Sequence, residues 1–407
     1  MIPLEEAQAH VFAQITQLGV TTLKLSEARS LFTATPIRAS VSVPPFDNTA
    51  VDGYAVRSTD LRGASLESPV VLQVVGTLAA GESANLEVGP NTAVRIMTGA
   101  PIPEGADSIV MVEDTSKGPN DTVLVYTPTS IGGSIRNAGS DIASGDVVFP
   151  AYTEITPAVI GSIASVGLTE VEVIKRPRVA VISTGSELTD EVPLPLGKIR
   201  DSNRPSLMAA ITEMGAEPID YGPVPDDYQQ LKEVFTKASK ECDAVVTSGG
   251  VSVGDFDYSK KVLEEISSNQ MRWMQISIKP AKPFAFGMIG SKPLFGLPGN
   301  PVSALVSFEL FARPSIAMMM GNPNPFRTVT KALVPEGIKR SSDGKIHFLR
   351  STVRFDQNGK LQCEVNVGQS SHMLSSLAHS NALAVVPDGI GIDKNGLVEV
   401  MLLARVI

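Results

Sequence analysis

The sequence predicts an α/β protein with additional all-β modules, and three observations favour this fold class. Between residues 178 and 326, apolar runs of strand length alternate with helical segments, the pattern of parallel strands joined by crossover helices. In residues 70–150 and 327–407, short β-rich runs are instead separated by Gly and Pro. The chain has 407 residues, 43% of them hydrophobic and 19% charged, so it can bury more than one core.

The N-terminal region is expected to begin with an amphipathic helix from residue 3, because apolar residues recur there at helical spacing (Leu4, Ala7, Val11 and Ile15). A short strand and a second helix from Ser26 should follow. Residues 43–56, VPPFDNTAVDGYAV, contain two prolines, an Asp-Asn pair and an Asp-Gly step, so they predict a loop with turns.

The next region predicts a small β domain inserted into a helical one. Four β-rich runs favour a compact barrel or sandwich at 45–144; they lie at 70–78, 92–100, 108–115 and 121–128. A helix is then expected at 156–167 and a strand at 171–174. We interpret residues 1–44 and 145–177 as one discontinuous domain around the β insert.

The α/β domain is expected at 178–326. Its predicted strands are 179–185, 218–224, 243–250, 271–278 and 293–300, and its predicted helices are 205–214, 228–240, 258–266 and 301–320. Residues 327–407 should form a terminal β domain, with hairpin turns at the steps Asp343-Gly344, Asn358-Gly359 and Asn395-Gly396.

Charge and cysteine content exclude several classes of function. The net charge of -9 offers no overall positive field for nucleic acid or an anionic membrane. Cys242 and Cys363 lie far apart, which argues against a disulfide framework and a thiolate metal cluster. The N-terminus lacks a signal peptide pattern, and no apolar run of about 18 residues is evident, so a cytoplasmic protein is expected.

Glycine-rich turns follow three of the predicted strands, where open parallel sheets bind their ligands. They are 183–187 (STGSE), 248–254 (SGGVSVG) and 296–301 (GLPGNP). Glycine lets backbone N–H groups approach an anion, and a following helix N-terminus adds positive potential, so phosphate is the natural ligand. Each turn alone is equally well explained as an ordinary strand-to-helix connection. None has the spacing of a Walker loop or a dinucleotide fingerprint, so ATP hydrolysis and NAD chemistry are disfavoured.

Charged residues flank the same turns. Lys279 and Lys282 lie in a proline-rich loop that would hold them rigidly beside an oxyanion, although isolated lysine pairs are more often plain surface residues. Acidic residues lie near the turns at Glu187, Asp226, Asp227, Asp255 and Asp257. Asp227 and Asp257 could equally cap helices, whereas carboxylates beside phosphate would indicate Mg²⁺. The four scattered histidines argue against a zinc site.

Seven motifs, in order, give the chain a resemblance over nearly its whole length to the molybdopterin molybdenumtransferase (MoeA) family, which includes the E domain of gephyrin. The motifs are PPFDNTAVDGYAV, RIMTGAPIPEGAD, IRNAGSDIASGDVV, ISTGSEL, SGGVSVGDFDY, IKPAKPFAFG and GLPGNPVSA. The resemblance implies a homodimer of elongated four-domain subunits, with the 178–326 domain binding molybdopterin and the 327–407 domain resembling a β-barrel. It also implies that molybdate is inserted into adenylylated molybdopterin with Mg²⁺ and release of AMP.

By motif, the resemblance assigns residues to the cleft between the α/β domain of one subunit and the β insert of the other. The expected catalytic residues are Asp52, Thr98, Asp141, Glu187, Asp226, Asp257, Lys279 and Lys282. The expected metal ligands are Glu187, Asp226 and Asp257. The expected cofactor-binding residues are Gly185, Ser248, Gly249, Gly250, Ser252, Gly254, Pro298, Gly299, Asn300, Pro301 and Ser371. Ser186 stands where family members often have an acidic residue, so the role of that position is open.

Two other functions are compatible with parts of the sequence. A molybdopterin adenylyltransferase would share the α/β motifs, but the β insert and the C-terminal domain argue against it. A non-catalytic dimeric scaffold ranks last, because no long linker or attached domain is visible. Partners implied by the resemblance are the adenylyltransferase and molybdoenzyme apoproteins.

Overall fold

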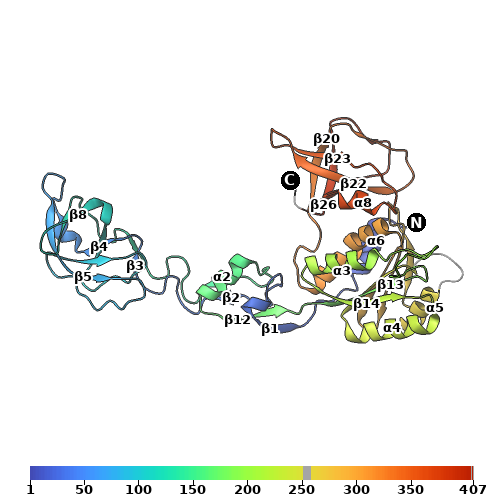
Figure 1. Ribbon diagram of the computed structural model, residues 1–407, viewed down its shortest axis with the longest axis horizontal. Coiled ribbons are helices and arrows are strands. Elements are labelled where there is room, and N and C mark those ends of the chain that lie inside the picture. Colours follow the sequence, from blue (N-terminus) through green and yellow to red (C-terminus); the bar gives the residue numbers. More distant parts are fainter. Residues whose placement is uncertain (251–257, 405, 407) are drawn as a thin grey trace. The chain divides into compact units, whose positions relative to one another are not determined.

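The computed structural model describes residues 1–250, 258–404 and 406, and the chain folds into two compact units. Unit 1 comprises Met1–Thr22, Ala28–Ala34 and Glu172–Ile407, and unit 2 comprises Leu23–Glu27 and Thr35–Val171. The chain passes between the units four times: within β1 (Val20–Lys24), after Glu27, after Ala34, and within β12 (Glu170–Ile174). The β insert expected from the sequence therefore belongs to unit 2, and the α/β and terminal β regions belong to unit 1 (Figure 1).

Unit 2 is built around a six-stranded sheet with the order β7-β4-β6-β5-β9-β8. Its strands are β4 (Gly53–Val56), β5 (Val70–Leu78), β6 (Thr92–Ile96), β7 (Ser108–Met111), β8 (Thr115–Lys117) and β9 (Thr122–Val125). Only the β5–β6 pair is parallel. Neighbouring residues of a strand pack into two separate apolar clusters (Ala55 and Val56, Ala93 and Val94, Ile109 and Val110). Because successive side chains point to opposite faces, both faces of this sheet are covered.

The rest of unit 2 consists of short pairings and one helix. β2 (Ile37–Arg38) pairs with β11 (Val147–Phe149), and β3 (Asn48–Thr49) pairs with β10 (Ile135–Arg136). The helix predicted at 156–167 is α2 (Pro157–Ser165), which Thr156 caps by accepting a hydrogen bond from the Val159 N–H at 3.3 Å.

Two N-terminal predictions are wrong. The second helix from Ser26 is only a 3-10 turn, Leu25–Glu27, because Ser30 adopts φ 63, which a right-handed helix cannot contain. The segment 43–56 is not only a loop, since it contains β3 and β4. A Cβ at Gly53 would lie 2.0 Å from the Val110 carbonyl oxygen, so the Asp-Gly step permits close strand packing rather than a turn.

Unit 1 contains a second six-stranded sheet, with the order β14-β13-β15-β19-β18-β16. Its strands are β13 (Arg178–Thr184), β14 (Glu217–Val224), β15 (Ala244–Ser248), β16 (Arg272–Gln275), β18 (Pro283–Ile289) and β19 (Lys292–Leu297). The first four in the order are parallel, as predicted. β18 pairs antiparallel with β19, and β16 pairs antiparallel with β18. The strand β18 was not predicted separately from the preceding lysine loop.

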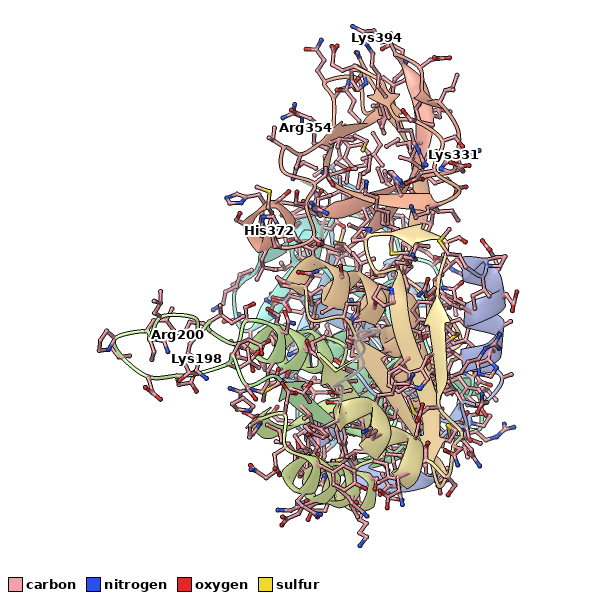
Figure 2. All side chains as sticks on the ribbon, turned by 90° about the vertical axis from the view of Figure 1, so that its right-hand side faces the viewer. Lys198, Arg200, Lys331, Arg354, His372 and Lys394 are labelled. Atoms are coloured by element: carbon pink, nitrogen blue, oxygen red, sulfur yellow. The ribbon has the colours of Figure 1, made fainter. Side chains whose placement is uncertain are left out.

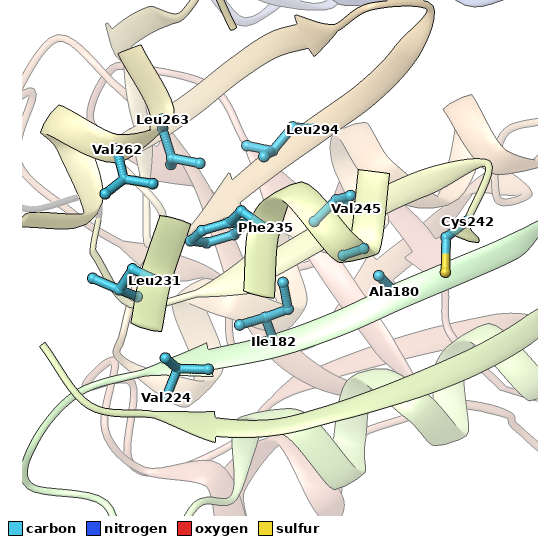
Figure 3. Close-up of a cluster of buried hydrophobic side chains, with 11 residues drawn as sticks. Ala180, Ile182, Val224, Leu231, Phe235, Cys242, Val245, Val262, Leu263 and Leu294 are labelled. Carbon is cyan, nitrogen blue, oxygen red and sulfur yellow. The ribbon is translucent and has the colours of Figure 1, made fainter. Parts of the chain in front are cut away.

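Helices cover both faces of this sheet (Figure 1). The helices are α1 (Leu4–Phe12), α3 (Asn203–Glu213), α4 (Tyr228–Glu241) and α5 (Tyr258–Ile266), followed by α6 and α7. Figure 3 shows Leu231 and Phe235 of α4 and Val262 of α5 packed over Ile182 and Val245 of the sheet. These side chains form an apolar core beneath the strand ends that carry the glycine turns.

The long apolar helix predicted at 301–320 is interrupted. α6 (Pro301–Ser307) and α7 (Arg313–Met319) flank a π-helical segment, Phe308–Ala312. Pro314 has no N–H to donate to the Leu310 carbonyl, and the Gln8 side chain donates to that carbonyl instead, at 3.0 Å. By length and composition, Pro301–Met319 could cross a membrane, contrary to expectation, but 78% of its most apolar window is buried inside the protein.

The C-terminal part of unit 1 is a closed barrel. Strands β22 (Ile346–Phe355), β23 (Leu361–Val365), β20 (Val329–Val334), β26 (Gly396–Leu402) and β24 (Ala382–Val386) pair in this order, and β24 pairs again with β22. The short strands β21 (Ile338–Lys339) and β25 (Gly391–Ile392) pair with each other, and α8 (Leu374–Ala378) lies between β23 and β24 in the chain. Of the predicted hairpin turns, only Asn358-Gly359 joins directly paired strands.

One strand links the α/β layers to the barrel. The predicted strand 271–278 is split, because β17 (Ile278–Lys279) pairs in parallel with β22 instead of continuing along the α/β sheet. Lys279 is the register partner of His347. The lysine loop is therefore fixed to the barrel at its first residue.

Candidate functional site

Three glycine-rich turns meet at the carboxyl edge of the parallel strands. Ser183 of β13 is the register partner of Ser248 in β15, and Ser248 is the partner of Leu297 in β19. The Gly249 N–H donates to the Leu297 carbonyl at 3.1 Å, and a Cβ at Gly299 would lie 4.0 Å from the Gly249 Cα. The cofactor-binding candidates Gly185, Ser248, Gly249, Gly250 and Gly299 thus lie along one edge, whereas Ser252 and Gly254 fall outside the described residues.

Glycine is required at the second turn by backbone geometry and crowding. Gly249 has φ +91, and a Cβ there would lie 2.4 Å from the Thr184 carbonyl oxygen. A side chain at this position would therefore push the second turn away from the first. The close approach holds the two turns side by side.

Asn203 ties the turns together, and the sequence analysis missed it. At the start of α3, its amide nitrogen donates to Ser248 Oγ at 2.6 Å and to the Gly299 carbonyl at 2.8 Å. Its Oδ1 atom is buried and has no partner among the described residues, and the same holds for Ser183 Oγ, Thr184 Oγ1 and Thr247 Oγ1. Buried polar atoms are rarely left unpaired, so these atoms suit a polar ligand. The only signal in the sequence was a polar DSN step before a helix.

Ser186 connects the acidic candidates of the first turn. The Ser186 N–H donates to Asp226 Oδ2 at 3.2 Å, and the Asp226 N–H donates to Ser186 Oγ at 3.1 Å. The Glu187 carboxylate folds back over Gly185, since a Cβ there would lie 2.6 Å from both its oxygens. Asp227 caps α4 by accepting from the Gln230 N–H at 2.9 Å, which favours the capping alternative for this residue.

The loop after the first turn is held by its own cations. The Lys198 ammonium donates to the Ser186 carbonyl at 2.6 Å, and Arg200 donates to the Thr189 carbonyl at 2.9 Å. Figure 2 shows both side chains on a loop that stands away from the helices of the α/β layers. Through Lys198, the loop therefore holds the backbone carbonyl of Ser186 in place.

The expected metal ligands are only partly described. Asp257 lies outside the described residues. Within the described residues, no group of three or more His, Cys, Asp and Glu side chains is placed to hold a metal ion. Glu187 and Asp226 supply two carboxylates at the same edge, a donor set that fits Mg²⁺ completed by substrate phosphates and water.

The lysine loop lines a large basic cavity. The cavity has a volume of about 1280 Å³ and lies between this loop, Ser303 of α6, the barrel and the segment 369–372. Seven charged residues line it, six of them basic: Lys279, Lys282, Lys339, Arg340, Lys345 and Arg350, against Asp343 alone. The site candidate Ser371 lines the same cavity, and its carbonyl accepts from the Val302 N–H at 3.1 Å. An anion is the ligand that this balance of charge favours.

Arg350 is a fully buried cation in the wall of this cavity. Its Nη2 donates to the carbonyls of Gly368 at 2.7 Å and Ser370 at 3.1 Å. Among the described residues, its Nε and Nη1 atoms have no hydrogen-bond partner, and no carboxylate forms an ion pair with it. Burial lowers the pKa of Arg350, since it penalises the charged form. A buried, unpaired guanidinium is costly, so an anionic ligand would complete this site.

Asp343 organises the rim of the cavity. It accepts hydrogen bonds from Arg340 at 2.7 Å and Lys345 at 3.1 Å, and it lies 3.2 Å from His347 Nε2. Burial opposes ionisation, but the hydrogen bonds from His347 and Lys345 lower the pKa of Asp343 to about 2. The aspartate is therefore ionised at neutral pH, and it holds three basic side chains in place.

The remaining candidates belong to the turns and to unit 2. Pro298 is buried in the third turn, while Asn300 and Pro301 start α6. In unit 2, the Thr98 N–H and Oγ1 both donate to Asp52 Oδ1 at 2.7 Å. These bonds, first from the backbone and then from the side chain of Thr98, lower the pKa of Asp52. Asp141 is exposed, and its N–H donates to the Val43 carbonyl at 3.0 Å.

Family models match three consecutive parts of the chain. Residues 2–167 match the model described as MoeA N-terminal region (domain I and II). Residues 180–318 match a probable molybdopterin binding domain, and residues 335–403 match the MoeA C-terminal region (domain IV).

Whole-length relatives agree with these matches. The chain is 37% identical over 396 residues to molybdopterin molybdenumtransferase 2 of Mycobacterium tuberculosis, covering 96% of each chain. It is 35% identical over 388 residues to molybdopterin molybdenumtransferase of Haemophilus influenzae, covering 95% of this chain and 94% of that protein. Among solved structures, it is similar to a molybdopterin biosynthesis moeA protein from Pyrococcus horikoshii OT3, with a TM-score of 0.82 and 31% identity, covering 99% of this chain and 100% of that one.

Proposed function

The chain belongs to the MoeA family of molybdopterin molybdenumtransferases, transferases of molybdenum cofactor biosynthesis, and on this basis we propose that it inserts molybdate into adenylylated molybdopterin with release of AMP. The observation that carries this proposal is the basic cavity with buried Arg350 in its wall, in the same unit as the glycine-rich turns. The reaction needs a place for a phosphorylated pterin and a place for a tetrahedral oxyanion.

The adenylylated pterin binds at the three turns. Backbone N–H groups of glycine-rich turns are suited to phosphate, and Asn203 Oδ1 and Thr184 Oγ1 are buried acceptors for the donor groups of a pterin. The floor of this binding site consists of Ser248, Gly249 and Gly299. Asn203 holds the second and third turns together there through its hydrogen bonds to Ser248 and Gly299.

Molybdate binds in the basic cavity. Arg350 supplies two nitrogen atoms, Nε and Nη1, whose N–H groups have no partner among the described residues, and the exposed Lys279 and Lys282 add charge from the lysine loop. Ser303 and Ser371 add hydroxyl groups that can donate to the oxygens of a tetrahedral anion. Donors fixed on a barrel and a strand stabilise developing negative charge with little reorganisation.

Glu187 and Asp226 would hold Mg²⁺, with Asp257 as a third expected ligand. When bound, the ion would neutralise charge on the phosphoanhydride that links AMP to molybdopterin. Ser186 orients Asp226 through their two mutual hydrogen bonds. Water attacks the phosphorus of AMP, and the bond between that phosphorus and the bridging oxygen breaks. AMP leaves with the water oxygen, the pterin keeps the bridging oxygen in its own phosphate, and a proton is released to solvent.

The protein acts as a cytoplasmic homodimer in this proposal. Asp52, Thr98 and Asp141 of unit 2 complete the site of a second subunit, as the family resemblance implies. The adenylyltransferase and molybdoenzyme apoproteins are the expected supplier and recipient of the cofactor.

The test supplies adenylylated molybdopterin, Mg²⁺ and molybdate or tungstate, and measures AMP release together with metal-loaded cofactor. We expect AMP to be released and loaded cofactor to form with at least one oxyanion. A parallel reaction with ATP and molybdopterin should give no pyrophosphate. Absence of AMP release with both oxyanions, or rapid pyrophosphate formation from ATP, would contradict the proposal.

A further inference from the structure

His347 lies in the wall of the basic cavity, on the strand that also carries Arg350. It is the register partner of Lys279 in the parallel β17–β22 pair. Register partners project from the same face of a sheet, so the imidazole and the Lys279 ammonium are neighbours at the cavity wall.

The hydrogen bond to Asp343 determines which ring nitrogen of His347 carries a proton. Nε2 lies 3.2 Å from both carboxylate oxygens of Asp343. An ionised carboxylate only accepts hydrogen bonds, so Nε2 is protonated. In the neutral ring, Nδ1 then holds a lone pair, and within the described residues it has no hydrogen-bond partner.

The surroundings keep the free imidazole neutral. The charged groups that face it are Lys279 from β17, and Arg340, Asp343 and Lys345 from the segment between β21 and β22. Asp388 pairs with Arg340 at 3.0 Å. Burial, followed by Arg340 and Lys279, lowers the pKa of His347, and Asp343 offsets this only in part. A dianion in the cavity would act in the opposite direction, since a nearby negative charge favours imidazolium.

We propose that His347 is a substrate-binding residue that takes up a proton at Nδ1 when the oxyanion enters the cavity, and so adds a cation to the site only in the bound state. This inference rests on the proposed function, which places the oxyanion in this cavity. The proton comes from solvent, and no covalent bond of the oxyanion changes.

Proton uptake gives binding a defined dependence on pH. Anion binding raises the pKa of His347, so affinity is highest below the pKa of the free protein and falls as pH rises through the pKa of the complex. With one proton, affinity can change by at most about tenfold per pH unit. We expect molybdate to bind about tenfold more tightly at about pH 6 than at about pH 8.

The experiment measures molybdate binding to the full chain by titration calorimetry from about pH 6 to about pH 8, in buffers of different ionisation enthalpy. Wild-type protein should take up a fraction of a proton per anion. H347Q should bind more weakly at low pH and lose the uptake. H347K should bind with the wild-type low-pH affinity at every pH, a gain that a misfolded variant could not show. H379Q, which removes the histidine directly after α8 and outside the cavity, should behave like wild type.

The outcomes separate this inference from the proposed function. If wild-type protein binds no molybdate at any pH, both are overturned. If it binds without proton uptake, or if uptake persists in H347Q and is lost in H372Q, the role of His347 alone is overturned, because His372 also lines the cavity.

Discussion

At the scale of single residues, Arg350 shows best how environment determines role. Arg350 and Arg354 lie four positions apart on β22, so the alternation of a strand places them on the same face. Arg350 is fully buried, whereas the Arg354 side chain is 63% exposed and pairs with Glu364 at 3.2 Å. The same side chain is therefore a binding group at one position and a surface charge at the other.

Replacing Arg350 should affect binding more than folding. Arg350→Met removes two hydrogen bonds to carbonyls but also a costly buried charge, so the free energy of unfolding should change by less than about 2 kcal/mol. AMP release should fall on the order of 100-fold, as when a preorganised anion donor is lost. Urea unfolding and the AMP assay measure the two effects.

Arg354→Met is the matched control, and it should leave both quantities near their wild-type values, since exposed ion pairs contribute little. Equal losses of activity in the two variants would show that Arg350 has no special role.

Ser186 illustrates a residue whose role the sequence left open. In place of an acidic residue, it forms two reciprocal hydrogen bonds with Asp226. In this protein, residue 186 therefore orients the Asp226 carboxylate and does not supply a carboxylate of its own.

At the scale of elements, the glycine turns depend on crowding between neighbouring strands. Gly249 and Gly290 both have positive φ, +91 and +61. A Cβ at Gly249 would meet the Thr184 carbonyl oxygen at 2.4 Å, whereas nothing lies within 4 Å of a Cβ at Gly290.

These two glycines allow backbone strain to be separated from crowding. Gly290→Ala should cost about 1 kcal/mol of unfolding free energy, from the left-handed conformation alone. Gly249→Ala should cost about 2–4 kcal/mol, because the second turn must also move, and it should weaken binding of adenylylated molybdopterin. Chemical denaturation and ligand titration measure both effects; similar costs for the two variants would mean that the turn relaxes freely.

At the scale of the whole molecule, the candidate site residues are divided between the two units. Lys282 and Arg350 lie in unit 1, and Asp52 and Thr98 lie in unit 2. If sites form between subunits, inactive variants from different units should complement each other.

Co-expression of Asp52→Ala and Lys282→Ala chains with different affinity tags tests this division. Random pairing should restore about a quarter of wild-type AMP release, because half of the dimers have one intact site. Lys282→Ala with Arg350→Met should restore nothing, since both changes lie in unit 1. Lack of recovery in the first pair, with dimers verified, would place each site within one chain.

The sequence by itself determined the parallel strands, the helices between them and the glycine-rich turns, because local periodicity and turn chemistry specify these elements. It also determined the family, through long motifs in a fixed order. It did not reveal β4, since four residues among turn signals are too short to show a period. Pro314 signals a break in the helix predicted at 301–320, but the bond from Gln8 that satisfies the freed Leu310 carbonyl joins residues 302 positions apart, so it could not be read from the sequence.

Only the tertiary structure decided the composition of the basic cavity. The rigid lysine loop was recognised from its prolines, but Arg340, Lys345, His347 and Arg350 were not, because charged residues in loops and alternating strands are usually exposed. The β17–β22 pairing places His347 beside Lys279. The balance of charge in a cavity depends on which strands, distant in the sequence, lie next to each other. Tertiary packing determines those neighbours, and local sequence does not.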